Sequence, residues 1–244
     1  MISVCMATYN GEKYIRQQLD SIISQIGKDD EIVISDNESS DKTVLIIKSY
    51  NDPRIKLFTY KCDRASLITK VKKDKNITNN FENALKNCRG DFIFLSDQDD
   101  IWFQNKIEKQ LPLLQKYDLV MSNATLVDGK NNVIKERLYE KDPLYKGIFS
   151  FRARGCLFAI TRSLLNKALP VPKSVFFHDL WFGILAEYRH SIYFIDIPLV
   201  FHRRGIGNAS TDVTEKSKNP LWFKIYYRLE LLIDGFFRSI RRNY

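Results

Sequence analysis

The sequence lacks the features that mark several specialised classes of protein. No stretch approaches the roughly 18 unbroken apolar residues of a membrane-spanning helix, and the first residues do not resemble a secretory signal. The four cysteines, at positions 5, 62, 88 and 156, include no CxxC pair, which argues against a zinc site and indicates reduced thiols in a cytosolic protein. Repeats and low-complexity segments are absent. A chain of 244 residues, 44% hydrophobic and 27% charged, is instead typical of one large globular unit.

Positive charge is concentrated in the second half of the chain. Residues 1–100 contain 15 Lys/Arg and 16 Asp/Glu, a net charge of −1, whereas residues 101–244 contain 23 and 13, a net charge of +10. This asymmetry indicates that the second half faces an anionic partner, either a nucleic acid or a membrane surface. Charge alone does not distinguish the two.

Apolar runs and helical patterns alternate through the first hundred residues. Strands are expected at 2–7, 31–35, 54–60 and 92–95, helices at 15–26, 44–50 and 81–88, and a lysine-rich loop at 61–75. This order predicts an α/β fold with a Rossmann-like, doubly wound, mostly parallel central sheet. Ligands bind beyond the carboxyl ends of the strands in such sheets. The polar clusters 8–10, 36–37 and 97–100 fall at those ends and predict a site there.

The second half has a less regular pattern. Strands are expected at 119–126, 156–161 and 192–201, with a short helix at 180–188. From Leu221 onward apolar residues recur at helical spacing, which predicts a long C-terminal amphipathic helix.

The segment Ser96-Asp97-Gln98-Asp99-Asp100 places three carboxylates within four residues, directly after a buried strand. Such carboxylates raise one another's pKa unless a cation or several donors neutralise them. They therefore indicate a site for Mg²⁺ or Mn²⁺, whose remaining ligands would be substrate phosphate oxygens. The alternative is a solvated turn in which Asp100 caps the next helix.

Three stretches together resemble family 2 glycosyltransferases of the GT-A fold. They are 6–11 (MATYNG), 35–43 (SDNESSDKT) and 96–102 (SDQDDIW), and the last is similar to the subset that contains many bacterial rhamnosyltransferases. The resemblance is close over 1–110 and weaker to about 210. It implies a GT-A domain at 1–210, with a nucleotide-binding half at 1–110 and an acceptor and sugar half at 111–210.

The activity implied by this resemblance is metal-dependent transfer of a sugar with inversion at the anomeric carbon. The donor would be a dTDP- or UDP-linked sugar, with rhamnose among the candidates. The acceptor would be a hydroxyl of a cell-surface glycan or of a lipid-linked molecule. The identity of the sugar, the nucleobase and the linkage does not follow from the sequence.

The resemblance also assigns residues to the nucleotide and the metal. Nucleotide-binding residues would be Ala7, Thr8, Tyr9, Asp36, Asn37, Asp97 and, from the lysine-rich loop, Lys75. Tyr9 would flank the base, and Asn37 stands where the family usually has a second Asp. The cation, Mn²⁺ or Mg²⁺, would be held by Asp99 with Asp97 and His202. For Lys75 and for the basic segment around His202, a solvated charged surface is the alternative interpretation.

Further residues would handle the acceptor and the sugar. Asp179, before a short aromatic helix, would be the general base that inverting transfer needs, although it could simply begin that helix. The sugar and acceptor contacts would be Gly155, Cys156, His178, Trp181 and Arg204. Cys156 is expected to be a packed thiol, because inverting transfer needs no covalent intermediate.

The tail at 216–244 has seven Lys/Arg and two Asp/Glu. A basic helix with an apolar face can lie on anionic lipid, and we expect a cytoplasmic protein peripheral to the membrane. The alternative is a helix docked on the domain, or at a homodimer interface, with its basic side in water.

Two other functions are less consistent with the sequence. A sugar nucleotidyltransferase would want a glycine-rich phosphate loop with Arg or Lys after the first strand, where this chain has Thr8-Tyr9-Asn10-Gly11. A basic nucleic-acid-binding protein is compatible with the charge of +9, but it leaves the acidic strand end without a purpose. No nucleic-acid partner is therefore expected.

Overall fold

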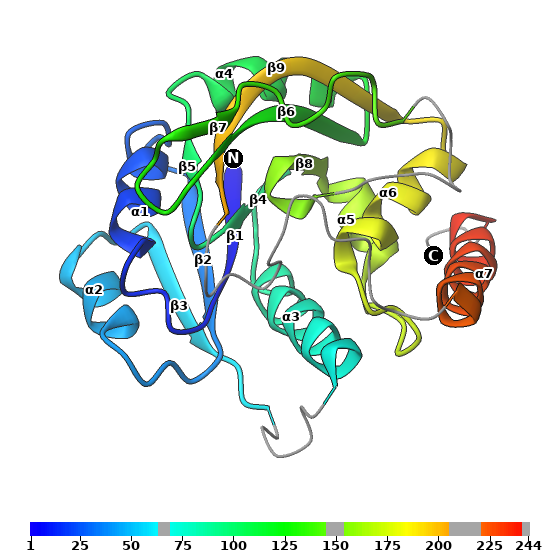
Figure 1. Cartoon of the computed structure of the whole chain (residues 1–244), viewed down its shortest axis with the longest axis horizontal. Helices are drawn as coiled ribbons and strands as arrows, with labels where there is room; N and C mark the ends of the chain where they lie inside the picture. Colours follow the sequence, from blue (N-terminus) through cyan, green and yellow to red (C-terminus); the bar gives the residue numbers. More distant parts are fainter. Residues whose placement is uncertain (63–68, 145–153, 205–220, 241–244) are drawn as a thin grey trace.

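The chain forms one curved mixed sheet with helices packed around it (Figure 1). The computed structural model describes residues 1–62, 69–144, 154–204 and 221–240. The strands are β1 Ile2–Thr8, β2 Glu31–Asp36, β3 Ile55–Thr59, β4 Phe92–Asp97, β5 Ile101–Trp102, β6 Leu119–Val127, β7 Val133–Lys135, β8 Phe158–Thr161 and β9 Ile192–Arg203. The helices are α1 Ile15–Ile23, α2 Thr43–Ser49, α3 Lys70–Leu85, α4 Lys106–Gln110, α5 Arg162–Ala168, α6 His178–Tyr188 and α7 Leu221–Ile240.

The strand order is β3-β2-β1-β4-β8-β6-β9-β5, with β7 paired to β6. The first four strands are parallel, which confirms the doubly wound arrangement predicted for the first hundred residues. Beyond β4 the sheet is mixed, because β8 runs antiparallel to both β4 and β6 while β9 runs parallel to β6. In Figure 1, β6 and β9 curve together over one end of the molecule.

The register of the parallel strands decides which polar residues meet. Thr8 at the end of β1 is paired with Asp36 at the end of β2, and Ala7 is paired with Asp97 at the end of β4. Because the strands are parallel, all three polar clusters emerge at the same edge of the sheet. This confirms the expectation drawn from their positions in the sequence.

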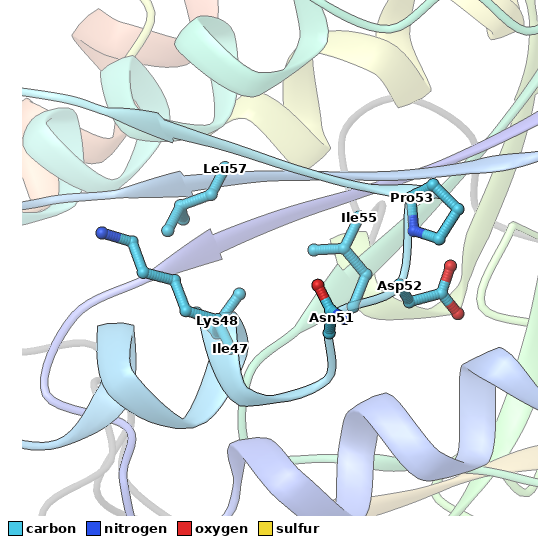
Figure 2. Close-up of a pocket in the computed structure, with 7 residues that line it drawn as sticks. All are labelled: Ile47, Lys48, Asn51, Asp52, Pro53, Ile55 and Leu57. Carbon is cyan, nitrogen blue, oxygen red and sulfur yellow. The ribbon is translucent and has the colours of Figure 1, made fainter.

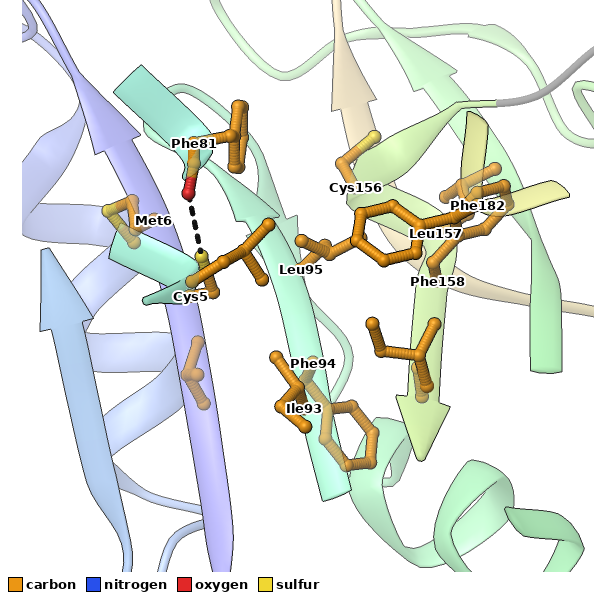
Figure 3. Close-up of a cluster of buried hydrophobic side chains, with 14 of the residues drawn as sticks. Cys5, Met6, Phe81, Ile93, Phe94, Leu95, Cys156, Leu157, Phe158 and Phe182 are labelled. Carbon is orange, nitrogen blue, oxygen red and sulfur yellow. Dashed lines mark hydrogen bonds between the residues drawn. The ribbon is translucent and has the colours of Figure 1, made fainter. Parts of the chain in front are cut away.

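The two halves of the chain share one hydrophobic core (Figure 3). Cys5 and Leu95 come from β1 and β4, whereas Phe158 and Phe182 come from β8 and α6, and all are fully buried. The halves at 1–110 and 111–210 are therefore parts of one sheet and one core rather than separately packed units.

Two sequence expectations need correction. The lysine-rich stretch 61–75 is not a loop throughout, because α3 begins at Lys70; the Thr69 hydroxyl accepts a hydrogen bond from the Lys72 N–H (3.3 Å) and caps the helix. Asp100 does not cap the helix that follows it, since α4 starts after Asn105. No helix within the described ranges has the length and apolar content that crossing a membrane requires.

Gly90, which precedes β4, offers a test of the packing. A Cβ at this position would lie 2.5 Å from the backbone nitrogen of Ser3, which cannot move without disturbing β1. Gly90→Ala should lower the free energy of unfolding by about 1–3 kcal/mol, measured by urea denaturation. Gly27→Ala is the matched control, because its Cβ would meet only the Asp30 carboxylate, at 3.4 Å. Equal stability of the two variants would contradict this account.

Candidate active site

The loops that follow β1 and β2 are tied to each other by side-chain hydrogen bonds. The Thr8 hydroxyl donates to the Asp36 carboxylate (2.8 Å), which also accepts from the backbone N–H and hydroxyl of Ser39. The Asn10 N–H donates to the Ser39 hydroxyl (2.9 Å). Thr8, Asp36 and Asn37 are almost fully buried. Two of the predicted nucleotide-binding loops therefore form one rigid unit.

The third loop is joined to the first by Gln98. Its side-chain amide exchanges two hydrogen bonds with the backbone of Tyr9, accepting from the N–H (2.9 Å) and donating to the carbonyl (3.0 Å). A Cβ on Gly11 would collide with this amide, so a larger residue there would displace Gln98 from Tyr9. Tyr9 is 44% exposed, so its ring can be reached from solvent.

The carboxylates of Asp97, Asp99 and Asp100 are crowded at the end of β4. Burial raises the pKa of Asp97 to about 7, and the charges of Asp100 and Asp179 add to the rise. Burial together with Asp100 and Asp97 likewise raises the pKa of Asp99 to about 7. Crowded acidic oxygens are stabilised by a cation, and oxygen ligands are those that Mg²⁺ and Mn²⁺ prefer. The donor set therefore fits the expected ion.

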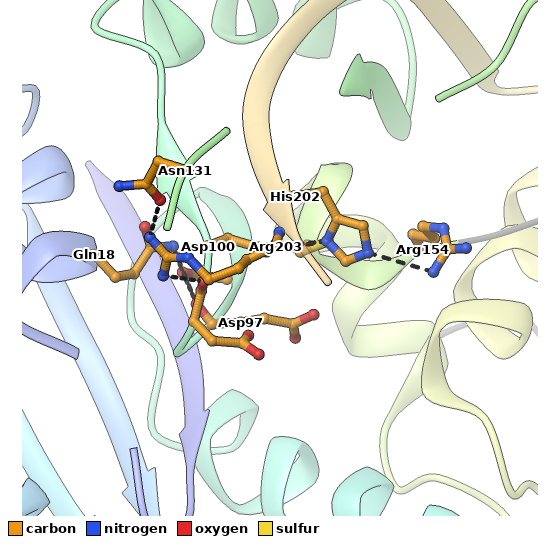
Figure 4. Close-up of polar contacts among 10 residues, drawn as sticks. Gln18, Asp97, Asp100, Asn131, Arg154, His202 and Arg203 are labelled. Atoms are coloured by element: carbon orange, nitrogen blue, oxygen red, sulfur yellow. Dashed lines mark hydrogen bonds and ion pairs between the residues drawn. The ribbon is translucent and has the colours of Figure 1, made fainter. Parts of the chain in front are cut away.

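Asp100 behaves differently from its neighbours because it has partners of its own (Figure 4). It accepts hydrogen bonds from the Arg203 N–H (3.0 Å) and from His202 Nδ1 (3.0 Å). Burial alone would raise the pKa of Asp100, but the His202 ring and these bonds bring it below the usual value. The other ring nitrogen of His202 lies 3.4 Å from Arg154 Nη1, so the imidazole joins Asp100 to Arg154.

His202, which was predicted to hold the cation with Asp99 and Asp97, therefore has its two ring nitrogens next to Asp100 and Arg154. Within the described part of the chain, Asp100, Cys156 and His202 also form a candidate metal cluster, with ligand atoms within 4.8 Å of one another. Burial next to Asp100 and Asp97 raises the pKa of the Cys156 thiol well above its usual value. Cys156 is packed, as expected, but inside this polar cluster.

Arg203 holds the backbone of the acidic loop by a hydrogen bond from its guanidinium. Its guanidinium donates to the Asp99 carbonyl (2.6 Å), to Gln17 (2.9 Å) and to Asn131 (2.6 Å), and it lies over the ring of Tyr14 at 4.2 Å. Arg204, also buried, lies near Arg154, Asp97 and Asp100, and burial lowers its pKa.

Gly155, His178 and Asp179 meet at the start of α6. A Cβ on Gly155 would lie 2.7 Å from His178 Nε2 and 3.7 Å from the Asp179 Cβ, so the glycine permits this approach. The His178 ring stacks on Phe81 at 4.2 Å, and burial lowers its pKa to about 4, which keeps it neutral. Burial raises the pKa of Asp179 to about 6, and the charge of Arg154 opposes the rise. Asp179 also influences Asp97, so the predicted base lies near the acidic loop.

Two predicted site residues have other surroundings. The Lys75 ammonium donates to the carbonyls of Pro172 (3.0 Å) and Val175 (2.7 Å), so it ties α3 to the segment before α6 instead of facing a diphosphate. Trp181 is fully buried and its indole N–H donates to the Ala168 carbonyl (3.0 Å). It is a core residue, and the acceptor contact predicted for it would require an exposed ring.

Three residues near the site were not singled out by the sequence. Gln18 of α1 donates to the Ser96 hydroxyl (2.6 Å) and to the Asp97 carbonyl (3.1 Å). Tyr139 is buried near Arg154 and Asp179. Lys106 is fully buried with its ammonium 5.1 Å from the Trp102 ring centroid. Of these three, only Gln18 could have been found from the sequence, because it is a polar residue on the apolar face of a predicted helix. The positions of Tyr139 and Lys106 near the site depend on tertiary contacts.

A hollow of about 230 Å³ lies elsewhere, between α2 and β3 (Figure 2). Its lining includes Ile47, Ile55 and Leu57 but none of the predicted site residues. Its one acid, Asp52, is paired with Arg54 at 2.7 Å. This hollow therefore lacks the chemistry found at the end of β4.

Comparisons with known proteins identify curated relatives of this chain. Relatives include the Escherichia coli UDP-Glc:alpha-D-GlcNAc-diphosphoundecaprenol beta-1,3-glucosyltransferase WfgD, 26% identical over 96% of this chain and 93% of WfgD. Another is the Shigella flexneri dTDP-rhamnosyl transferase RfbG, 28% identical over 96% of this chain and 81% of RfbG.

Two solved structures share the fold. Staphylococcus aureus TarS in complex with UDP-GlcNAc has a TM-score of 0.69 at 19% identity, over 99% of this chain and 68% of that one. Mycobacterium tuberculosis glucosyl-3-phosphoglycerate synthase with Mn²⁺ and UDP has a TM-score of 0.57 at 19% identity, over 100% and 81%. These are GT-A glycosyltransferase folds.

The family model "Glycosyl transferase family 2" matches residues 3–168, more than half of the chain. The matched segment includes the coupled loops after β1 and β2 and the acidic loop after β4. The chain therefore belongs to glycosyl transferase family 2 and is a glycosyltransferase that acts on a nucleotide sugar.

Proposed function

We propose that this protein is an inverting, metal-dependent glycosyltransferase with a donor site at the end of β4 and Asp179 as its base. The observation that carries the proposal is the convergence of Asp97, Asp99, Asp179 and Arg154 from β4, α6 and the segment before β8. Two of these acids would bind a cation and the third would act as the base. The guanidinium of Arg154 would stabilise the negative charge of the leaving group. A solvated turn would have no reason to gather them.

Asp179 suits proton removal from the acceptor. In inverting transfer the acceptor oxygen attacks the anomeric carbon as the bond from that carbon to the diphosphate oxygen breaks, and the diphosphate leaves with the electron pair. Asp179 takes the proton of the acceptor hydroxyl, which requires a carboxylate within hydrogen-bond reach. Gly155 keeps the backbone close to this acid, and the neutral His178 beside it would orient the sugar or the acceptor.

Asp99 and Asp97 would hold Mn²⁺ or Mg²⁺. When bound, the ion neutralises charge that develops on the departing diphosphate. Arg203 fixes the carbonyl of Asp99, and Gln18 fixes that of Asp97, so this chain holds both acids in place before any ligand arrives. Arg154 and Arg204 add positive charge beside them.

The donor would be a UDP- or dTDP-linked sugar. The exposed Tyr9 ring would flank the base, while Asp36 and Asn37 would accept its imide N–H. The relative RfbG is named as a dTDP-rhamnosyl transferase, which favours rhamnose as the sugar to test. WfgD is named for a diphosphoundecaprenol substrate, which supports a lipid-linked acceptor.

A thermal-shift panel tests the donor site. The panel compares UDP, dTDP, the UDP- and dTDP-linked sugars, and GDP, each with and without Mn²⁺. A ligand that binds the folded state raises the melting temperature of the protein. We expect a shift with UDP or dTDP that requires Mn²⁺, and a smaller one with GDP. Equal shifts with and without the ion would contradict metal dependence.

Asp179→Asn should lower the turnover number by about 100- to 10,000-fold, because the amide cannot accept the proton. Nucleotide affinity, measured by calorimetry with Mn²⁺, should stay within a few-fold. Glu187→Gln, at the other end of α6, is the control and should keep normal turnover. Substantial turnover by Asp179→Asn would exclude this residue as the base.

Asp99→Asn should weaken nucleotide diphosphate binding in the presence of Mn²⁺ by at least about tenfold, since a charged ligand to the ion is lost. Binding measured in EDTA should not weaken in the variant, because without the ion the Asp99 carboxylate can only repel the diphosphate. Glu108→Gln, an exposed acid on α4, controls for net charge. If Mn²⁺ strengthens binding to the variant as much as to the parent, Asp99 does not hold the ion.

A further inference from the structure

Helix α7 packs on the domain through a narrow face. Tyr227, Leu231 and Gly235, spaced four residues apart, are turned inward, and Tyr227 and Leu231 are buried. A Cβ on Gly235 would lie 2.8 Å from Ile184 of α6, so the glycine allows the two helices to approach closely. Figure 1 shows α7 at the margin of the molecule against α5 and α6.

Polar contacts fix this orientation. The Tyr188 hydroxyl donates to the Leu232 carbonyl (3.0 Å), and Arg238 donates to the carbonyls of Leu169 and Pro170 (3.0 Å each). The domain-docked interpretation of the tail placed its basic side in water. For Arg238 this was wrong, because its guanidinium faces the domain.

The opposite face of α7 is apolar and exposed. Seven large side chains are each between 50% and 58% exposed: Ile225, Tyr226, Leu229, Ile233, Phe236, Phe237 and Ile240. At 100° per residue they fall on one arc, opposite the inward face. Contiguous apolar surface of this kind marks an interaction site. The segments 216–220 and 241–244 of the predicted tail lie outside the described residues.

Charge indicates which partner fits. Without Arg238, which faces the domain, the tail at 216–244 still has six Lys/Arg and two Asp/Glu, a net charge of 6 − 2 = +4, and the whole chain has a net charge of +9. Two copies paired through α7 would bring two such tails together, and like charges repel. An anionic surface has the complementary charge. Moreover, Ile225 and Phe237 make the exposed apolar arc wider than the narrow apolar stripe that two paired helices bury between them.

We propose that the outward face of α7 binds the surface of an anionic bilayer, with the helix lying parallel to it. The apolar side chains would enter the boundary between headgroups and acyl chains, as those of interfacial amphipathic helices do. The Phe177 and Tyr227 rings are 5.6 Å apart, so this docking would hold the Asp179 end of α6 near the membrane. The inference does not depend on the proposed chemistry of Asp179.

The test is co-sedimentation of the full chain with vesicles. We expect binding to phosphatidylcholine vesicles with phosphatidylglycerol at about one third of the lipid, and binding at least about tenfold weaker to phosphatidylcholine alone. The triple variant Leu229→Gln, Ile233→Gln and Phe237→Gln should bind the anionic vesicles at least about tenfold more weakly.

A matched triple variant, Leu45→Gln, Val133→Gln and Ile134→Gln, removes three exposed apolar residues elsewhere and should bind like the parent. Both triple variants should keep the parent melting temperature and the Mn²⁺-dependent nucleotide shift, which separates this proposal from the donor site. The proposal is overturned if the parent does not bind vesicles or if the α7 variant binds as well as the parent. It is also overturned if light scattering shows a dimer that only the α7 variant dissociates.

Discussion

The structure depends on the crowding of carboxylates at the end of β4. Asp97, Asp99 and Asp100 lie within four residues in a poorly hydrated position, and burial and mutual repulsion oppose their ionisation. The chain compensates only one of them fully, since Asp100 accepts from His202 and from the Arg203 backbone. The remaining charge is left for a ligand. An acidic loop neutralised entirely from within would have no affinity for a cation, whereas one with no internal partner would destabilise the fold.

Positioning of this loop is shared among elements distant in sequence. Gln98 joins it to the backbone of Tyr9, Gln18 of α1 supports the last residues of β4, and Arg203 at the end of β9 holds the Asp99 carbonyl. These contacts are possible because β1, β2 and β4 are parallel and in register, so their ends meet. A site that binds a flexible diphosphate gains from such order, because little conformational entropy remains to be lost on binding.

Features that are contiguous in sequence could be predicted, and features that depend on long-range packing could not. The parallel half of the sheet and the acidic strand end followed from apolar runs and polar clusters. The fold of the second half was harder to predict, because the direction of β8 depends on its pairing with β6, 37 to 41 residues earlier, and with β4, 65 to 69 residues earlier. Lys75 and Trp181 show the same limit. Lys75 lies in a basic stretch and Trp181 lies beside a predicted base, so both look functional in the sequence. In the structure, however, Lys75 donates to backbone carbonyls before α6 and Trp181 is buried in the core.

The tail shows why amphipathicity alone does not give orientation. The sequence specifies an apolar arc and an opposing basic side, and both a docked helix and a lipid-bound helix satisfy that pattern. The orientation of the helix is determined by its small inward face. Gly235 allows Ile184 to approach closely, and Arg238 donates to a backbone carbonyl just after α5. Docking through a glycine and a few polar contacts leaves the larger apolar area outside. Since α6 carries Asp179 at one end and packs against α7, a partner bound to that outer face would be connected to the proposed base through a single helix.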